Sequence, residues 1–343
     1  MTTPLVTVLI DTYNYGCYIE EAIESVLAQS FPLEQLEILV VDDGSTDDTR
    51  ERMAKYARRV TYLYKPNGGQ ASAFNAGVAQ ARGEIVFLLD ADDYFLPGKI
   101  RRIVEEFQNH PEVGIIYHQL QELDSATGKL RNATFDFVPI SGFLRDDKAK
   151  LTAYYPHQTS CLAFRLDLLK RVLPMPESMR THADAFIERV AVLLAPVLAV
   201  SEPLAVYRIH SRNLAYWDWT NSAADAVRRR AASYIVVLKE VRAWMQGHEQ
   251  ELAGLEPSKY LLPEIFDLQE TLYQSEPPGR LRYFRFLLAK NHASADLQSV
   301  RYTAYNYMMA VFALAFGYSR TVQLRRRGLE RIRSSLKGEK VSR

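Results

Sequence analysis

The sequence has few cysteines and no export signal. Its 343 residues include two cysteines, Cys17 and Cys161, placed at a predicted helix start and in a predicted buried strand. That number and spacing exclude a disulfide scaffold and do not suit a metal cluster bound by cysteines. The N-terminus lacks the basic segment and cleavage site of a signal peptide. These absences predict a protein of the reducing cytoplasm.

The sequence also has no large excess of positive or negative charge. The chain holds 42 Lys and Arg residues against 41 Asp and Glu residues, a formal net charge of +1. Nucleic-acid binding needs a basic face, so this balance predicts no nucleic-acid partner. The local exception is a basic tail that begins at Arg320 and contains few acids.

No hydrophobic run is long enough for a typical membrane-spanning helix, which needs about 20 apolar residues. The longest candidate, Tyr302 to Ser319, has no charged residue but is interrupted by polar residues and Gly317. An apolar helix with tyrosines beside an arginine cluster is suited to the surface of an anionic membrane. We therefore expect peripheral contact at the inner face of a membrane. The alternative is that the same stripe packs against the rest of the chain or forms a homo-oligomer.

Residues 5 to 125 alternate short apolar segments with amphipathic segments of helical period. This alternation is typical of βαβ units and predicts an α/β protein with a parallel sheet. From about residue 221 the strand signals stop and long helical stretches follow. A chain of this length exceeds one comfortable core, so we expect one large domain and an appended helical region.

The stretch from Ile85 to Asp93 is the most informative one. Its apolar run has the length of a buried strand and ends in Asp90, Asp92 and Asp93. Ligands of open α/β sheets bind beyond the carboxyl ends of strands, and carboxylates crowded there repel one another unless a cation neutralises them. Mg²⁺ or Mn²⁺ bound to a diphosphate fits this pattern. The alternative is that Asp92 and Asp93 cap the next helix.

Two earlier strands end in the same way. Leu5 to Ile10 is followed by Asp11, Thr12 and Tyr13, and Glu37 to Val41 is followed by Asp42 and Asp43. Parallel strands deliver their carboxyl ends to one edge of a sheet, so these polar groups should meet the acids that follow residue 89. Helix capping alone does not require three such strands.

These segments carry a resemblance. In order and spacing, this part of the chain resembles the nucleotide-sugar-binding half of a family 2 glycosyltransferase. The segments that carry the resemblance are VTVLIDTYNYGCYIEEAIESVLAQS, ILVVDDGSTDDT and NGGQASAFNAGVAQARGEIVFLLDADD. The resemblance implies a GT-A fold, with a Rossmann-like, mostly parallel sheet flanked by helices. It covers about residues 1–215, divided into a nucleotide-sugar-binding half (1–125) and an acceptor half (126–215). Residues 216–343 would form the helical C-terminal region.

The resemblance also implies roles for single residues. It places the metal-binding acid of the DxD motif at Asp92 and the base-binding acid at Asp43, with Asp42 as a structural acid. The other residues expected at the donor are Asp11, Thr12, Tyr13, Gln70 and Asp90. The Asn-Gly-Gly-Gln loop that contains Gln70 would border the donor sugar; the alternative is an ordinary turn.

The catalytic base is implied by the stretch RTHADAFIER, which makes Asp184 the candidate. The family's usual Glu before this Asp is replaced by Ala183. An acid in a first helical turn can also simply favour the helix dipole. Further along, YRIH resembles the segment that ends the family's catalytic domain, and His210 there is a candidate metal ligand or a structural histidine.

The sequence thus predicts a metal-dependent inverting glycosyltransferase. It would move a sugar from a nucleotide-diphosphate sugar to a hydroxyl of a glycan or lipid-linked acceptor, in synthesis of bacterial cell-surface polysaccharide or glycolipid. A sugar nucleotidyltransferase is the nearest enzyme alternative, and a non-catalytic nucleotide- or carbohydrate-binding module is the other. A hydrolase with a GxSxG nucleophile is excluded because that motif is missing.

Overall fold

The computed structural model describes residues 4–133, 139–213, 224–252, 255, 261, 268–270, 272–273, 277–294 and 300–325. The chain forms two compact units. The first comprises Met1–Asp218 and Lys239–Leu255, and the second comprises Trp219–Leu238 and Glu256–Arg343. The division of the chain into functional domains at residue 215 stays a prediction.

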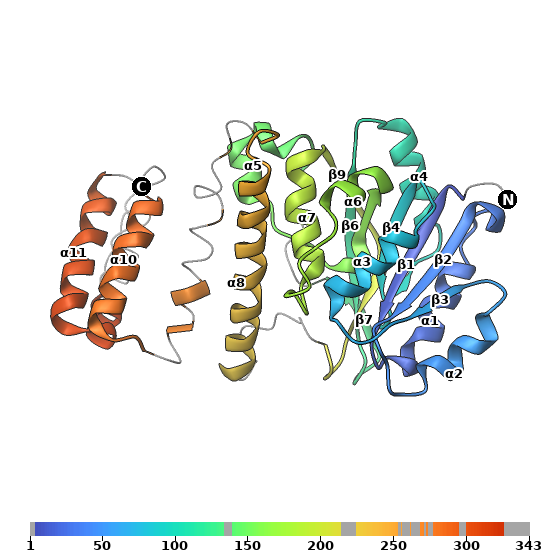
Figure 1. The fold of residues 1–343 in the computed structure, drawn as a ribbon, viewed down its shortest axis with the longest axis horizontal. Coiled ribbons are helices and arrows are strands. Elements are labelled where there is room, and N and C mark those ends of the chain that lie inside the picture. The colour runs from blue at the N-terminus through green and yellow to red at the C-terminus, as the bar shows by residue number, and fades with distance from the viewer. Residues whose placement is uncertain are drawn as a thin grey trace, which may run out of the picture. The chain divides into compact units, whose positions relative to one another are not determined.

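The first unit is built on one sheet, whose first half is parallel (Figure 1). Its strands run in the order β3-β2-β1-β4 and comprise β1 (Val6–Thr12), β2 (Leu36–Asp42), β3 (Thr61–Tyr64) and β4 (Ile85–Asp90). The apolar residues of β1 and β4 and most of those of β2 are buried because helices cover the sheet, as near-continuous hydrophobic runs predict, whereas the edge strand β3 is partly exposed. The register pairs Asp11 with Asp90 and Thr12 with Asp42, so the three acid-terminated strands end at one edge.

The second half of the sheet is mixed rather than mostly parallel. Strand β8 (Leu162–Arg165) runs antiparallel to both β4 and β6 (Ile115–Asp124). Strand β9 (Val197–Ile209) is parallel to β6 and antiparallel to β5 (Tyr94–Phe95). Strand β7 (Lys129–Asn132) pairs antiparallel with the end of β6 and forms a hairpin with it.

Helices flank this sheet as the apolar periodicity predicts. They are α1 (Gly16–Leu27), α2 (Thr49–Met53), α3 (Gln70–Gln80), α4 (Lys99–Asn109), α5 (Lys148–Ala153), α6 (Leu166–Val172) and α7 (Ala183–Leu194). In α1, Ile19, Ala22, Ile23 and Val26 share one face and are fully buried. Helix α4 begins after Gly98, which has a left-handed φ of 84°, so the acids that follow β4 do not cap it.

The second unit is helical in its described part. Helix α8 (Ala224–Gly247) contributes residues to both units, whereas α10 (Arg280–Ser294) and α11 (Val300–Phe316) belong to the second alone. Helices α10 and α11 lie side by side in Figure 1. Their shared core contains Tyr273, Tyr283, Phe286, Leu287, Ala310 and Ala313. Within the described residues, none of the helices has the length and hydropathy needed to cross a membrane.

Candidate active site

Asp11 and Asp90 form the centre of the site. They are register partners on neighbouring strands, and each carboxyl group influences the pKa of the other. Withdrawal from water raises the pKa of Asp11 to about 7 and the pKa of Asp90 well above its ordinary value, because the charged forms lose hydration. The charge of Asp11 raises the pKa of Asp90 further. Among the described residues, Asp11 Oδ1 and the buried hydroxyl of Thr12 have no hydrogen-bond partner.

The two acids of the next turn have different surroundings. Asp93 is buried and uses both oxygens, accepting hydrogen bonds from Ser160 Oγ at 2.6 Å and from the Arg208 N–H at 2.8 Å. Asp92 Oδ2 lies 2.9 Å from His210 Nε2 and 3.3 Å from Asn213 Nδ2. The other oxygen of Asp92 therefore remains the better placed to meet a ligand.

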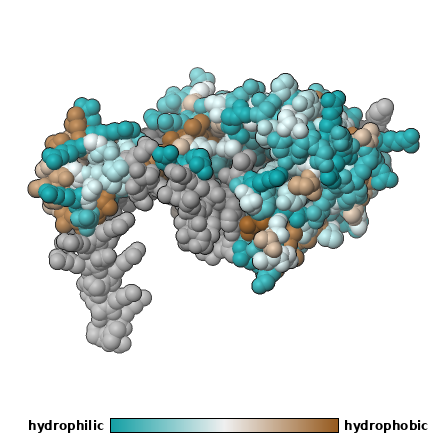
Figure 2. Space-filling model, turned by 90° about the horizontal axis from the view of Figure 1, so that it is seen from below, coloured by the Kyte–Doolittle hydropathy of each residue, from teal (hydrophilic) through white to brown (hydrophobic). Residues whose placement is uncertain are grey.

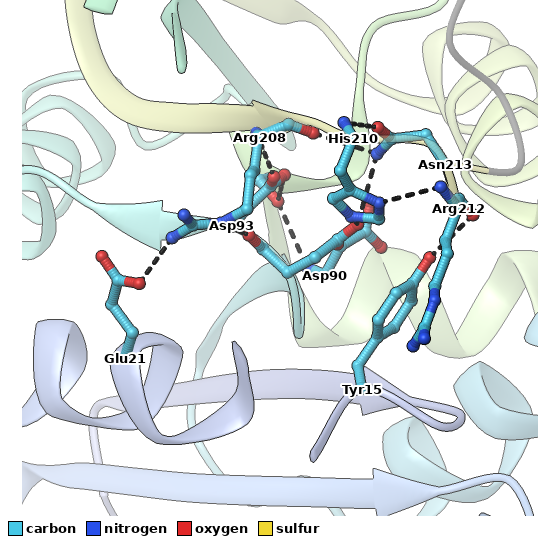
Figure 3. Close-up of polar contacts among 10 residues, drawn as sticks. Tyr15, Glu21, Asp90, Asp93, Arg208, His210, Arg212 and Asn213 are labelled. Carbon is cyan, nitrogen blue, oxygen red and sulfur yellow. Dashed lines mark hydrogen bonds and ion pairs between the residues drawn. The ribbon is translucent and has the colours of Figure 1, made fainter. Parts of the chain in front are cut away.

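Arg208 fixes this acidic turn. Its Nε donates to the carbonyl of Asp92 at 2.7 Å, and its Nη2 donates to Glu21 of α1 at 2.5 Å (Figure 3). The guanidinium also lies 5.0 Å from the centre of the Tyr18 ring. Arg208 thus ties strand β9 to the acidic turn and to α1.

His210 is held on the same side of the turn. Its Nδ1 accepts the backbone N–H of Arg212 at 3.1 Å (Figure 3). Its ring stacks on that of Tyr18, with the ring centroids 5.0 Å apart. Because Nδ1 accepts a hydrogen bond, the neutral ring carries its proton on Nε2, which then donates to Asp92. To bind a cation through Nε2, the ring would have to release the Arg212 bond and move its proton to Nδ1.

Asp184 lies in the first turn of α7, after His182, which has a left-handed φ of 59°. Asp184 Oδ1 accepts the Ala185 N–H at 2.8 Å, and Oδ2 accepts the hydroxyl of Thr159 at 3.2 Å. Withdrawal from water raises its pKa to about 6, and the negative charge of Glu188 one turn later contributes to the rise. A carboxyl group with this pKa is largely ionised at neutral pH and can accept a proton.

Asp43 organises the loop expected to border the donor. Its carboxylate accepts hydrogen bonds from Lys65 Nζ at 2.7 Å, Gly68 N at 2.9 Å and Gly69 N at 2.6 Å. Asp42 accepts the Ser45 N–H at 2.7 Å, which is the structural role expected from the sequence. Asp43 thus holds the loop that the sequence predicted to lie beside the donor.

That loop also contacts the N-terminus of α7. Gln70 N donates to the Arg180 carbonyl at 3.1 Å, and Gln70 Oε1 accepts the Ala183 N–H at 3.0 Å. Gln70 therefore satisfies an amide at the start of the helix that carries Asp184, a role no local pattern in the sequence indicated. Tyr13, by contrast, is 46% exposed and stands at the end of β1.

The donor set fits a divalent cation. One ligand oxygen from each of Asp90, Asp92 and Asp93 lies within 4.8 Å of the others. Burial is the main cause of the raised pKa values of Asp11, Asp90 and Asp93, and the negative charges of neighbouring carboxylates raise them further. A hard cation would offset that charge, and the partnerless Asp11 oxygen indicates that the site is shaped to receive a ligand.

Comparison with proteins of known sequence identifies the class. The model of "Glycosyl transferase family 2" matches residues 7–173. An uncharacterized glycosyltransferase of Nostoc is 39% identical over 219 residues, which are 61% of this chain and 66% of that protein. Another, from Mycoplasma pneumoniae, is 31% identical over 227 residues, which are 64% of this chain and 72% of the relative. The chain belongs to glycosyl transferase family 2.

Solved structures show the same fold at lower identity. S. aureus TarS 1-349 in complex with UDP-GlcNAc matches with a TM-score of 0.55 and 18% identity, covering 94% of this chain and 92% of that one. The mannosyltransferase PcManGT from Pyrobaculum calidifontis, in complex with GDP-Man and Mn²⁺, matches with a TM-score of 0.51 and 21% identity, covering 94% and 83%. The fold is the GT-A type with a C-terminal helical region.

Proposed function

We propose that this protein transfers a sugar from a nucleotide-diphosphate sugar to a hydroxyl group of a glycan or lipid-linked acceptor, with inversion at the anomeric carbon. The observation that carries the proposal is that Asp11, Asp90 and Asp92 lie together at one edge of the sheet. The negative charge of Asp184, on helix α7, also raises the pKa values of Asp11 and Asp90. The setting is synthesis of cell-surface polysaccharide or glycolipid.

A divalent cation, Mg²⁺ or Mn²⁺, is part of the proposal. Asp92 is its proposed ligand and His210 its second, because the two side chains lie 2.9 Å apart and can reach one ion. When bound, the cation would act as a Lewis acid that neutralises the leaving diphosphate. Binding of the cation by His210 would require its ring to give up the hydrogen bond from the Arg212 N–H.

The donor would occupy the edge formed by β1, β2 and β4. Asp11 and Thr12 have polar atoms without partners among the described residues, and the ring of Tyr13 is exposed enough to support a nucleobase. Asp90 would meet the ribose. Asp43 and Gln70 would act on the donor through the loop they hold, and a direct bond from Asp43 to the base stays a prediction.

Asp184 is the proposed general base. With a pKa of about 6, Asp184 is still ionised near neutral pH. A carboxylate of this basicity can take the proton of the acceptor hydroxyl as the new bond forms. Because Thr159 and the Ala185 N–H hold the two oxygens, the carboxylate keeps one orientation.

Two measurements test the function. Thermal stability is measured with UDP-, dTDP- and GDP-sugars, each with and without Mn²⁺, since a ligand of the folded state raises the melting temperature. Release of nucleoside diphosphate is then followed with acceptors present. Metal-dependent stabilisation together with nucleoside diphosphate release supports the proposal. Binding without release indicates a non-catalytic module, and pyrophosphate formation from a sugar phosphate and a nucleoside triphosphate indicates a nucleotidyltransferase.

A further inference from the structure

Helix α11 is apolar on the face that does not meet α10. Ala310 and Ala313 are buried in the core of the helix pair, and Met309 is also buried. The outward side chains are between 39% and 62% exposed and include Tyr307, Met308, Val311, Leu314 and Phe316. Hydrophobic side chains gather on the surface of this part of the chain (Figure 2). Five large apolar side chains exposed within ten residues of one helix are typical of an interaction surface.

The surrounding sequence has a strong charge bias. Residues 277–343 hold 14 of the 42 Lys and Arg residues but only three of the 41 Asp and Glu residues. Residues 1–276 hold the remaining 28 basic residues against 38 acids. The small net charge of the whole chain therefore conceals a basic C-terminal segment. Within it, the stretch from Tyr302 to Ser319 has no charged residue at all.

These two properties discriminate among possible occupants of the α11 face. A second copy of this chain would bring an equally basic segment against the first, and like charges oppose such a symmetric contact. An anionic lipid surface satisfies both features, because apolar side chains enter the acyl boundary while arginines meet phosphate groups. Tyrosine is suited to the headgroup level, where one end of the ring is wet.

We propose that the outward face of α11, Tyr307 to Phe316, binds the surface of an anionic lipid bilayer. The helix lies in the plane of the interface, and the exposed Arg320 that follows it supplies attraction to phosphate. This proposal does not depend on the transferase reaction, so it stands or falls separately from the proposed function.

The test is co-sedimentation of the full chain with vesicles. Wild-type protein should sediment with vesicles of phosphatidylcholine and phosphatidylglycerol in equal parts, less at high salt, and little with phosphatidylcholine alone. The double variant Met308→Glu, Val311→Glu should lose about tenfold or more in vesicle affinity, because it places two carboxylates on the inserting face. Both positions are well exposed, so its melting temperature should match that of wild type.

Two further variants make the result specific. Leu33→Glu introduces the same charge at an apolar residue that is 52% exposed in the first unit, and it should bind vesicles as wild type does. If the double variant fails to fold, Met308→Gln with Val311→Thr keeps the side-chain size and should still weaken binding. Wild-type protein that stays in the supernatant with anionic vesicles overturns the proposal. So does a wild-type dimer that the double variant dissociates without any vesicle binding, since the occupant would then be a second copy.

Discussion

At the scale of single residues, a substitution at Asp92 can test the role of its negative charge without changing the size of the side chain. The variant Asp92→Asn keeps the side-chain volume and an oxygen that can accept from His210, but it removes the negative charge expected to hold the cation. We expect transfer to fall by about a hundredfold or more, with the fold intact. The assay is nucleoside diphosphate release at saturating donor, with the melting temperature measured in parallel. Asp146→Asn, at an exposed acid away from the site, is the matched control.

A second outcome of the Asp92 variant concerns stability. Because the charge of Asp92 raises the pKa of Asp93 and Asp11, its removal should leave the metal-free protein no less stable than wild type. Full activity in the variant, or activity that EDTA does not affect, would show that Asp92 holds no essential metal.

Asp184 predicts a pH profile with a definite sign. The base is active when ionised, so turnover should fall about tenfold per pH unit below its pKa of about 6. Asp184→Asn should retain donor affinity and lose about 10² to 10⁴ in turnover. The acidic limb of the profile should vanish with it. A variant that loses donor affinity and keeps its turnover would place Asp184 in the donor site instead.

At the scale of elements, the close contact between the Gly69 loop and the segment before α7 leaves no room for a side chain at Gly69. Gly69 has a φ of 89°, and a Cβ there would lie 2.6 Å from Arg180 Cα. Gly69→Ala should therefore lower the free energy of unfolding by about 2 kcal/mol or more, measured by denaturant titration. Turnover should fall too, because the same loop bonds Asp43 and the first turn of the Asp184 helix.

The control for that variant is Gly247→Ala at the end of α8. An added Cβ meets nothing within 4 Å there, and alanine is the better helix former. Equal losses in the two variants would mean that the close approach to Arg180 has no special cost.

The elements also show what sequence reasoning could reach. The acid-terminated strands β1, β2 and β4 were predictable because each is an apolar run followed at once by acids. The full length of strand β9 was not predictable, because Pro203 lies within it and proline lacks the N–H that a central strand needs. The structure places Pro203 opposite Gln119, at the register shift between β6 and β9, where regular pairing is already broken.

Side chains that act across long sequence separations were out of reach. Ser160 bridges the backbone N–H of Asp90 and the carboxylate of Asp93, and Lys99 donates to the Ser160 carbonyl at 2.7 Å. A buried lysine in a helix gives no local sign of such a partner. The bond between Lys99 and Ser160 can form only in the folded sheet, where β4 pairs with β8.

At the scale of the whole molecule, the raised carboxyl pKa values link stability to pH. Folding raises the pKa of Asp11 from 3.8 to about 7 and that of Asp184 from 3.8 to about 6. The folded state thus binds these protons more tightly than the unfolded state. The stability contributed by the two groups is complete below about pH 4 and is lost as the pH rises through 6 and 7.

The corresponding test uses Asp11→Asn in the presence of EDTA. This variant should melt above wild type near pH 8, because it no longer ionises a buried acid, and the difference should shrink toward pH 5. Melting temperatures across this interval give the difference directly. A constant difference at all pH values would mean that the Asp11 carboxyl does not titrate there.

The bonds from Arg208, His210 and Asn213 to the acidic turn have a consequence for the order of assembly. They join residues 115 to 121 positions apart, which is far beyond the reach of a helix or a hairpin. During synthesis the strand that ends in Asp90 is complete long before residue 213 leaves the ribosome. Until then the acidic turn lacks these three partners, and contacts of such separation are intrinsically slow to close. The nascent chain can therefore pair strands β1 to β4 before the residues that fix the acidic turn have been made.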